Sequence, residues 1–382
     1  MAVYLSLKEI WRLRGRFLLI SLVIALITLL VLFVAGLAEG LGAGNIEYLS
    51  KLNADLIVFQ ENSQQQVGAS RLDRSRLNDV ARLDGVAAVG PIGVSNAQII
   101  LPDSARPLDV SLVGVEPGRP GDVPVTQGRT FESRRASEVV IDLNTAARTK
   151  LSVGDSITLK TVQGTDEKFF TLTVAGITDG RQYFLRPSVF APDITWDRIR
   201  AKGGEPGGEL AYNVFAVKLI DPARAPEMLR LISQQVERVE TADIVTAYKK
   251  TPGYQEQQAT LDTQRIFTLI IGVLVIGGFF QIQTLQKVPQ IGMLKAIGAP
   301  SRTVALASIF QVMVVTVIGV FIGAAFTLLL AANFPVTVPI VFKANSTAIA
   351  IGSLLLIGPI GGLVSVRYSL RIEPLRALGL GA

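Results

Sequence analysis

The chain has 382 residues, of which 49% are hydrophobic and only 18% are charged. Because a soluble domain usually carries about a quarter of charged residues, this balance indicates a protein embedded in lipid. The chain contains no cysteine and no histidine, so it can form no disulfide and lacks the commonest metal ligand and general base. We therefore expect no catalytic residue, no metal site and no intrinsic cofactor.

The formal net charge of +6 is distributed unevenly along the chain. Residues 42–264 carry about 25 Lys and Arg against about 28 Asp and Glu, whereas the remainder carries about 12 basic and about 3 acidic residues. A face that binds nucleic acid would place its basic residues on the folded polar part of the chain, and that part is mildly acidic. We therefore exclude nucleic acid as a partner.

Residues 1–16 predict an amphipathic helix at the membrane surface, because Lys8, Arg12 and Arg16 recur every four positions. This helix either anchors the chain or contacts a partner. Residues 17–41 follow as the first transmembrane helix. The uncharged core of this helix is longer than that of a signal peptide, and no clear small-x-small cleavage site ends it.

Four uncharged segments reach the roughly 20 residues that a helix needs to cross a bilayer. They are Phe17–Ala38, Ile266–Leu285, Val304–Ala332 and Ser346–Val366. We expect an α-helical membrane protein with transmembrane helices over 17–41, within 254–287, over 304–332 and over 346–370, and an outer loop over 333–345. Glycines spaced four apart permit close packing of these helices within one chain or between two copies; they are Gly36, Gly40 and Gly44, Gly319 and Gly323, and Gly358 and Gly362.

Residues 42–253 predict a large α+β domain with mostly antiparallel strands, because alternating runs typical of strands surround two helical stretches. The helical stretches lie near Leu72–Leu83 and Ala223–Val236. Pro and Gly within 117–124 and 203–208 mark surface loops or a division into two subdomains. The runs typical of strands are Asp55–Phe59, Ala97–Leu101, Val110–Val115, Ser156–Lys160, Phe169–Val174 and Asn213–Leu219.

Residues 254–287 predict a helix that begins outside the membrane and continues as the second span. The run from Tyr254 to Arg265 is polar and contains neither Gly nor Pro, so we expect a helical stalk there. Such a stalk either transmits movement or is a passive linker.

Basic residues cluster within 8–16, 287–302 and 367–376, and positive charge favours the cytoplasmic side of a membrane. We therefore expect both termini, including residues 371–382, and the segment 288–303 in the cytoplasm, with the large domain outside. The chain lacks the Gly-x-x-x-x-Gly-Lys-Ser/Thr loop that binds nucleotide phosphates. The chain is therefore not an ATPase by itself.

The segment Gln286–Thr303 is a short amphipathic stretch between the second and third spans, and residues 291–299 read Ile-Gly-Met-Leu-Lys-Ala-Ile-Gly-Ala. This pattern resembles the cytoplasmic coupling segment of MacB/FtsX-type ABC permeases, in which Glu often stands at the position of Gln290. Further matches follow the order of that family at Ala54–Val58, Leu151–Thr158 and Arg371–Leu378. The resemblance implies that the contact with an ATPase is made by Gln290, Ile291, Gly292, Met293, Leu294, Lys295, Ala296, Ile297 and Gly298.

The same resemblance implies the partners and the location. Two copies of the chain would pair with two copies of a separate cytoplasmic ABC ATPase, which binds ATP and Mg, in the lipids of the bacterial cytoplasmic membrane. Nucleotide-driven closure of the ATPase would draw the inner ends of the second and third spans together, and the stalk would move the outer domain.

Within this family, Val275–Phe280 followed by Thr284–Gln286 is most similar to the permeases of bacterial haem exporters of the HrtB-like kind. That similarity implies haem as the substrate at the outer ends of the first two spans. Glu39, Tyr254 and Glu256 are the candidate oxygen ligands there, and each is alternatively an ordinary interfacial residue. Two other functions stay open: an FtsX-like mechanical signalling module that regulates an extracellular enzyme, and a permease that extracts lipoprotein or lipid.

Overall fold

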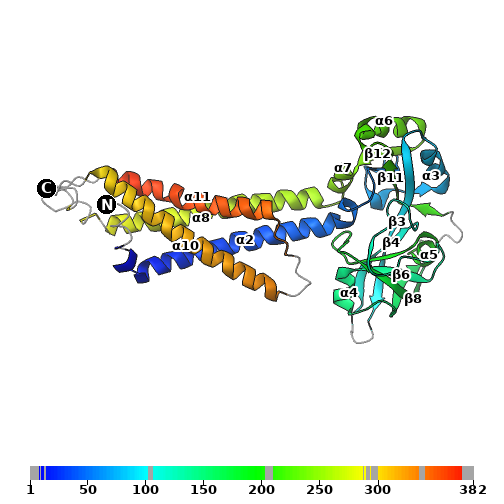
Figure 1. Ribbon diagram of the computed structural model, residues 1–382, viewed down its shortest axis with the longest axis horizontal. Helices are drawn as coiled ribbons and strands as arrows, with labels where there is room; N and C mark the ends of the chain where they lie inside the picture. The colour runs from blue at the N-terminus through cyan, green and yellow to red at the C-terminus, as the bar shows by residue number, and fades with distance from the viewer. Residues whose placement is uncertain are drawn as a thin grey trace. The chain divides into compact units, whose positions relative to one another are not determined.

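The computed structural model describes residues 8, 10–12, 14–101, 106–202, 210–286, 288–289, 293, 300–334 and 340–371. The chain forms two compact units (Figure 1). One is helical and comprises Met1–Gly40 and Ala259–Ala382, and the other comprises Leu41–Gln258 and contains the sheet. The second unit begins and ends within a few residues of the domain expected over 42–253.

Long helices build the first unit, and two of them continue into the second unit. They are α2 (Arg14–Ser50), α8 (Tyr254–Gln286), α10 (Ser301–Asn333) and α11 (Ala344–Arg371). Among the residues that the structure describes, three stretches are long and apolar enough to cross a membrane, namely Arg14–Ser50, Tyr254–Ile282 and Leu306–Asn333. The apolar stretch found in α11 is shorter and runs over Ala344–Leu356, so the length criterion supports three of the four expected spans.

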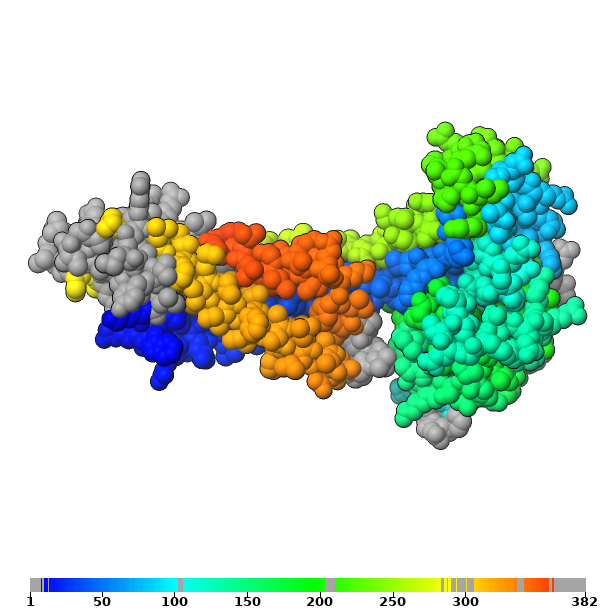
Figure 2. All heavy atoms as spheres, viewed as in Figure 1, coloured from blue at the N-terminus to red at the C-terminus, as the bar shows by residue number. Residues whose placement is uncertain are grey.

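Close packing between α2 and α10 depends on two of the glycines spaced four apart. A Cβ atom at Gly319 would lie 2.6 Å from the Ile24 side chain, and one at Gly323 would lie 2.5 Å from the carbonyl oxygen of Ala25. No larger residue fits there without moving a backbone. These glycines therefore pack helices of the same chain, and α10 also lies along α11 (Figures 1 and 2).

The second unit contains a ten-stranded sheet within the residues that the structure describes. Its order is β12-β1-β11-β3-β4-β9-β6-β8-β5, with β7 paired to both β3 and β8, and β2 pairs separately with β10. The strands are β1 (Leu56–Gln60), β2 (Leu72–Asp73), β3 (Val86–Ile100), β4 (Leu108–Val115), β5 (Val125–Gly128), β6 (Glu138–Asp142), β7 (Ser156–Gln163), β8 (Asp166–Thr178), β9 (Ser188–Pro192), β10 (Ala211–Tyr212), β11 (Val214–Leu219) and β12 (Val239–Asp243).

Helices cover the sheet, and apolar side chains alternate between its two faces. The helices are α3 (Arg74–Ala81), α4 (Leu143–Thr149), α5 (Asp193–Ile199), α6 (Ala225–Gln235) and α7 (Ile244–Lys249). Along β1, Leu56 and Val58 join one buried cluster, whereas Ile57 and Phe59 join the other. Because side chains of a strand point alternately to opposite faces, β1 is buried on both sides.

One side of the unit is built around Trp196 of α5. A Cβ atom at Gly93 or Gly114 would lie 2.3 Å from this indole ring, so the ring rests directly on the backbone of β3 and β4. Beside it, the buried carboxylate of Asp193 accepts hydrogen bonds from Arg134 Nε at 3.0 Å and from the Tyr212 hydroxyl at 2.7 Å.

The α+β class expected for this unit is confirmed, whereas the extent and pairing of some strands differ from the prediction. The six runs correspond to β1, β3, β4, β7, β8 and β11, and the two helical stretches correspond to α3 and α6. Most strand pairs are antiparallel, but β4 with β9 and β6 with β8 are parallel. The strand expected over Ala97–Leu101 is only the end of the 15-residue β3, whose Gly90-Pro91 and Gly93 conceal the alternating pattern.

Candidate functional site

The C-terminal part of α2 enters the core of the α+β unit. Tyr48 and Leu49 are 0% and 1% exposed and belong to one of the two buried clusters of that unit. The Tyr48 hydroxyl donates a hydrogen bond to the Gly121 carbonyl at 2.9 Å, and its ring lies 5.4 Å from that of Phe190. The last turns of a candidate transmembrane helix are thus a component of the domain's core.

A loop after β8 follows the same turns of α2 through backbone hydrogen bonds. The Tyr48 amide donates to the Gln182 carbonyl at 3.0 Å, the Phe184 amide to the Asn45 carbonyl at 3.3 Å, and the Leu185 amide to the Gly44 carbonyl at 3.1 Å. A Cβ atom at Gly44 would lie 2.7 Å from the Gln182 side-chain oxygen, so a larger residue there would displace the Gln182 side chain. Helix and loop are therefore joined independently of side-chain charge.

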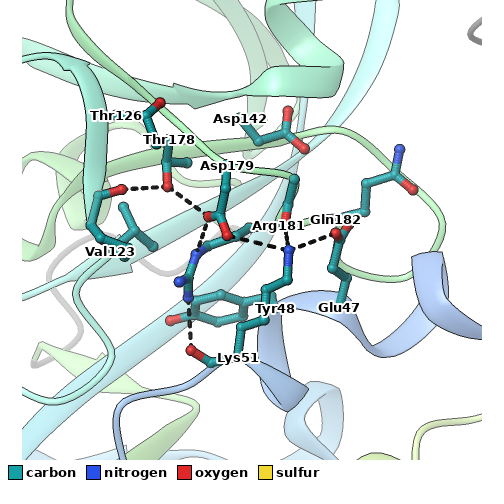
Figure 3. Close-up of polar contacts among 12 residues, drawn as sticks. Glu47, Tyr48, Lys51, Val123, Thr126, Asp142, Thr178, Asp179, Arg181 and Gln182 are labelled. Carbon is teal, nitrogen blue, oxygen red and sulfur yellow. Dashed lines mark hydrogen bonds and ion pairs between the residues drawn. The ribbon is translucent and has the colours of Figure 1, made fainter.

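Charged side chains reinforce this junction (Figure 3). Lys51 Nζ lies 2.9 Å from Glu47 Oε1 and 3.3 Å from Asp179 Oδ2. Arg181 donates from Nε to Asp179 Oδ1 at 2.7 Å and from Nη1 to the Lys51 carbonyl at 2.9 Å. The Gln182 amide donates to Glu47 Oε2 at 3.1 Å. We call these five residues the α2 clamp.

The electrostatics of the α2 clamp favour its charged form. Burial by itself would raise the pKa of Asp179, but the hydrogen bond from Arg181 and the charges of Arg181 and Lys51 lower this pKa below its ordinary value. Burial raises the pKa of Tyr48, although the charge of Arg181 opposes the change. At neutral pH the carboxylate is therefore ionised and the phenol is neutral.

A basic cavity adjoins the α2 clamp. It has a volume of about 560 Å³ and is lined by the basic side chains of Lys51, Arg119, Arg181 and Lys218, with Asp122 among them. Within the described residues, no group of three Asp or Glu side chains is placed to hold a metal ion. What the α2 clamp provides is a fixed connection between a long helix and a folded domain.

The start of α8 is the second place where a long helix leaves the α+β unit. Gly253, with a φ of 76°, ends the turn after α7, and α8 begins at Tyr254. The Tyr254 ring lies 6.0 Å from that of Tyr248 on α7. Glu256, in the first turn of α8, is exposed and lines a polar cavity of about 440 Å³.

The predicted substrate ligands Tyr254 and Glu256 are two residues apart in the first turn of α8 and therefore lie on different faces of that helix. Glu39 belongs to the helical unit. Glu39 forms an ion pair with Lys343 and accepts a hydrogen bond from the Ser346 hydroxyl at 3.2 Å. The Val341 amide donates to the Gly36 carbonyl at 3.0 Å nearby. Glu39 therefore ties the first long helix to the segment that leads into α11.

Most of the residues predicted to contact the ATPase fall outside the described part of the chain. Met293 alone among these predicted contacts is described, as helical and 58% exposed. The preceding helix, α8, ends at Gln286, whose side-chain oxygen accepts a hydrogen bond from Arg16. The predicted contacts outside the description are Gln290, Ile291, Gly292, Leu294, Lys295, Ala296, Ile297 and Gly298.

Reasoning from the sequence did not find the α2 clamp. One signal was available, because Glu47 and Lys51 are four residues apart on a helix and such a pair shares one face. Asp179 and Arg181 carry no comparable signal, since Arg181 meets Lys51 across 130 positions of the sequence.

Comparison with known proteins decides the family. A family model described as the MacB-like periplasmic core domain matches residues 17–235, which is more than half of the chain. A second model, described as the FtsX-like permease C-terminal, matches residues 266–374. The chain belongs to the MacB/FtsX-type ABC transporter permeases.

Several similar permeases align over nearly the whole chain. One from Staphylococcus haemolyticus, named as the permease HrtB of a hemin transport system, is 26% identical and the alignment covers 98% of this chain and 99% of that protein. An uncharacterized ABC transporter permease of Mycobacterium tuberculosis, Rv2563, is 23% identical with 99% of both chains covered. The solved periplasmic region of MacB from Actinobacillus actinomycetemcomitans is 13% identical, covers 51% of this chain and 90% of that one, and has a TM-score of 0.37.

As a MacB/FtsX-type permease, the chain is a multi-pass protein of the cytoplasmic membrane with a large α+β domain outside the cytoplasm. Permeases of ABC transporters are the subunits that do not catalyse a reaction, and they work with a partner ATPase. In this permease, the α2 clamp joins the first membrane helix to the periplasmic core domain.

Proposed function

We propose that this permease transmits ATP-driven motion of a partner ATPase to its outer domain and thereby expels an amphipathic substrate from the membrane or its outer face. The observation that carries the proposal is the α2 clamp. A helix whose last turns are buried in a domain, with Tyr48 fully buried, moves that domain when it tilts. The continuous α8 supplies a second connection of the same kind.

The assembly we propose contains two copies of this chain and two copies of the ATPase. The second span supports a paired arrangement, because only 17% of its most apolar stretch is buried within the chain, against 44% for α2 and 39% for α10. We further propose that α11 is the fourth span and that both termini and the 288–303 segment are cytoplasmic. The basic residues that flank the spans on that side support this orientation.

Haem is the substrate we propose, and ATP and Mg belong to the ATPase. The name of the S. haemolyticus relative supports haem, since that permease aligns over the whole chain. Tyr254 and Glu256 lie in the first turn of α8, which we place outside the membrane, where their oxygen atoms would be available to haem. Glu39 would contribute to a haem site only by exchanging its contact with Lys343 for one with the substrate.

The test is ATP hydrolysis and efflux by the complex of permease and ATPase in liposomes. We expect haem to stimulate hydrolysis several-fold and to leave the membrane in an ATP-dependent manner, while lipids and amphipathic drugs stimulate less. A spectral shift on haem addition that is unchanged by Glu39→Gln, Tyr254→Phe and Glu256→Gln would refute these ligands.

The signalling alternative makes a different prediction in the same assay. An FtsX-like module would hydrolyse ATP without haem efflux and would require an extracellular enzyme for stimulation. Extraction of lipoprotein or lipid would appear as ATP-dependent release of that cargo to an acceptor.

A further inference from the structure

The loop after β8, which lies along the last turns of α2, ends in a tight turn with an unusual sequence. Tyr183 and Arg186 form an isolated antiparallel bridge, and the two residues between them, Phe184 and Leu185, have positive φ angles of 54° and 60°. A two-residue turn with both φ angles positive is of type I′, which strongly favours Asn-Gly because the Cβ atom of other residues is crowded. Phe-Leu is therefore an unfavourable choice for this backbone.

The same two residues are also unfavourable in water. Phe184 is 44% exposed and Leu185 is 42% exposed. Backbone strain and exposed apolar surface thus coincide at the tip of one turn. Backbone hydrogen bonds from Phe184 and Leu185 to α2 hold the strained turn in place, but they leave both side chains exposed. An apolar environment outside the protein would offset the cost of the exposed side chains.

The position of the turn along α2 shows which environment that is. Gln182 pairs with Tyr48, Phe184 with Asn45 and Leu185 with Gly44, so the loop runs along α2 towards its membrane segment and the turn is the part nearest to it. Gly44 is six residues beyond Ala38, the last residue of the uncharged segment, which is about 9 Å along a helix.

The interfacial layer on each side of the hydrocarbon core is about 5–8 Å thick. Gly44 therefore lies just beyond the outer edge of that layer, and phenylalanine and leucine side chains at this height are long enough to reach into it. Aromatic residues of membrane proteins gather in this layer. Arg186 is partly exposed beside them, and its positive charge suits an ion pair with the phosphates of the lipid headgroups.

We propose that the turn Tyr183–Arg186 is a membrane anchor, in which Phe184 and Leu185 insert into the outer leaflet and Arg186 contacts lipid phosphates. The anchor would hold the loop of the α2 clamp at a fixed depth, so that tilting of α2 moves the outer domain about a point on the membrane surface. A lipid surface is the occupant we assign because the turn's height and its arginine both match it.

The absence of cysteine makes a direct test simple. Phe184→Cys carries a nitroxide label in the full-length permease, assembled with its ATPase in nanodiscs of phosphatidylcholine and phosphatidylglycerol. Phe169→Cys is the matched control, because Phe169 is 58% exposed on β8. Collision rates with oxygen, which concentrates in lipid, and with a water-soluble nickel chelate report the depth of each label.

We expect the oxygen-to-nickel ratio to be at least fivefold higher at position 184 than at position 169. Equal ratios would overturn the proposal and place the turn in water. A label at 184 that is shielded from both reagents would also overturn it, in favour of contact with a protein; spin–spin broadening would identify a second copy of the chain.

A second variant separates anchoring from folding. Phe184→Asn combined with Leu185→Gly supplies the preferred type I′ sequence, so the turn should form at least as well as before. With a label at Arg186→Cys, we expect the oxygen-to-nickel ratio to fall to the aqueous value in this variant, while the melting temperature in detergent stays equal or rises. A ratio that keeps its lipid-like value would contradict the proposal.

Discussion

Replacement of Arg181 with alanine tests whether the α2 clamp transmits motion. Arg181 is 6% exposed, and it bonds both to Asp179 on the loop and to the carbonyl of Lys51 at the end of α2. The variant removes both bonds and leaves Asp179 with the 3.3 Å contact to Lys51. The backbone pairing of the loop with Gly44 and Asn45 is untouched, so the domain should still fold.

The expected loss of stability is modest. A hydrogen bond of a charged group contributes about 1.5–3 kcal/mol, but the Asp179 side chain is 39% exposed, so water compensates part of the loss. We expect the free energy of unfolding of the outer domain to fall by about 2 kcal/mol, which lowers the melting temperature of a domain of this size by about 4–8 °C.

The effect on coupling should be larger than the effect on stability. In liposomes at 25 °C, we expect ATP hydrolysis within about twofold of the wild type and haem efflux reduced several-fold, because the backbone pairing keeps α2 attached to the domain but the loosened junction would transmit less of its tilt. Arg181→Lys should give an intermediate result. The control is Arg224→Ala, which breaks the surface pair with Glu227 elsewhere in the domain and should change neither activity. Wild-type efflux in the folded Arg181→Ala variant would refute the role of the α2 clamp.

Three further changes test separate parts of the structure. Gly323→Leu should overpack the contact with α2, where a Cβ would lie 2.5 Å from the Ala25 carbonyl, and should lower stability in detergent by about 1–3 kcal/mol. Gly352→Leu is the control, because Gly352 has open space around it. Equal melting temperatures of the two variants would contradict the packing of α10 on α2. Asp142 caps α4 and its pKa is raised by burial despite hydrogen bonds from Thr145 and Asn144, so its folded-state pKa exceeds its unfolded one. Stability should therefore rise as pH falls through the folded-state pKa towards about 3.8. Asp142→Asn should remove that rise in stability and should be at least as stable as the wild type at pH 7. Unfolding at a series of pH values measures both effects. A pH dependence of stability that is unchanged in the variant would contradict the assignment to Asp142. Leu294→Asp should abolish permease-stimulated ATP hydrolysis without preventing membrane insertion, and full stimulation would exclude the coupling segment as the contact.

The α+β domain was predicted in class, although not in its full extent. The alternating pattern revealed β7, in which the buried Ile157 and Leu159 alternate with more exposed residues. Strands β6 and β9 are nearly or fully buried, and such runs lack the alternation that marks a strand. Their parallel pairing depends on long connections that leave no local pattern.

The sequence by itself determined that the chain lies in a membrane and resembles the MacB/FtsX-type permeases. Uncharged runs of about 20 residues have no stable alternative in water, and the motif over 291–299 is a local pattern. Only the tertiary structure decided how the first helix is joined to the outer domain. The partners of Lys51 come from a loop about 130 residues away, and sheet pairing, not local spacing, brings that loop to α2. The same holds for Phe184 and Leu185, whose apolar character is plain in the sequence but whose exposure and positive φ angles arise only when the turn forms.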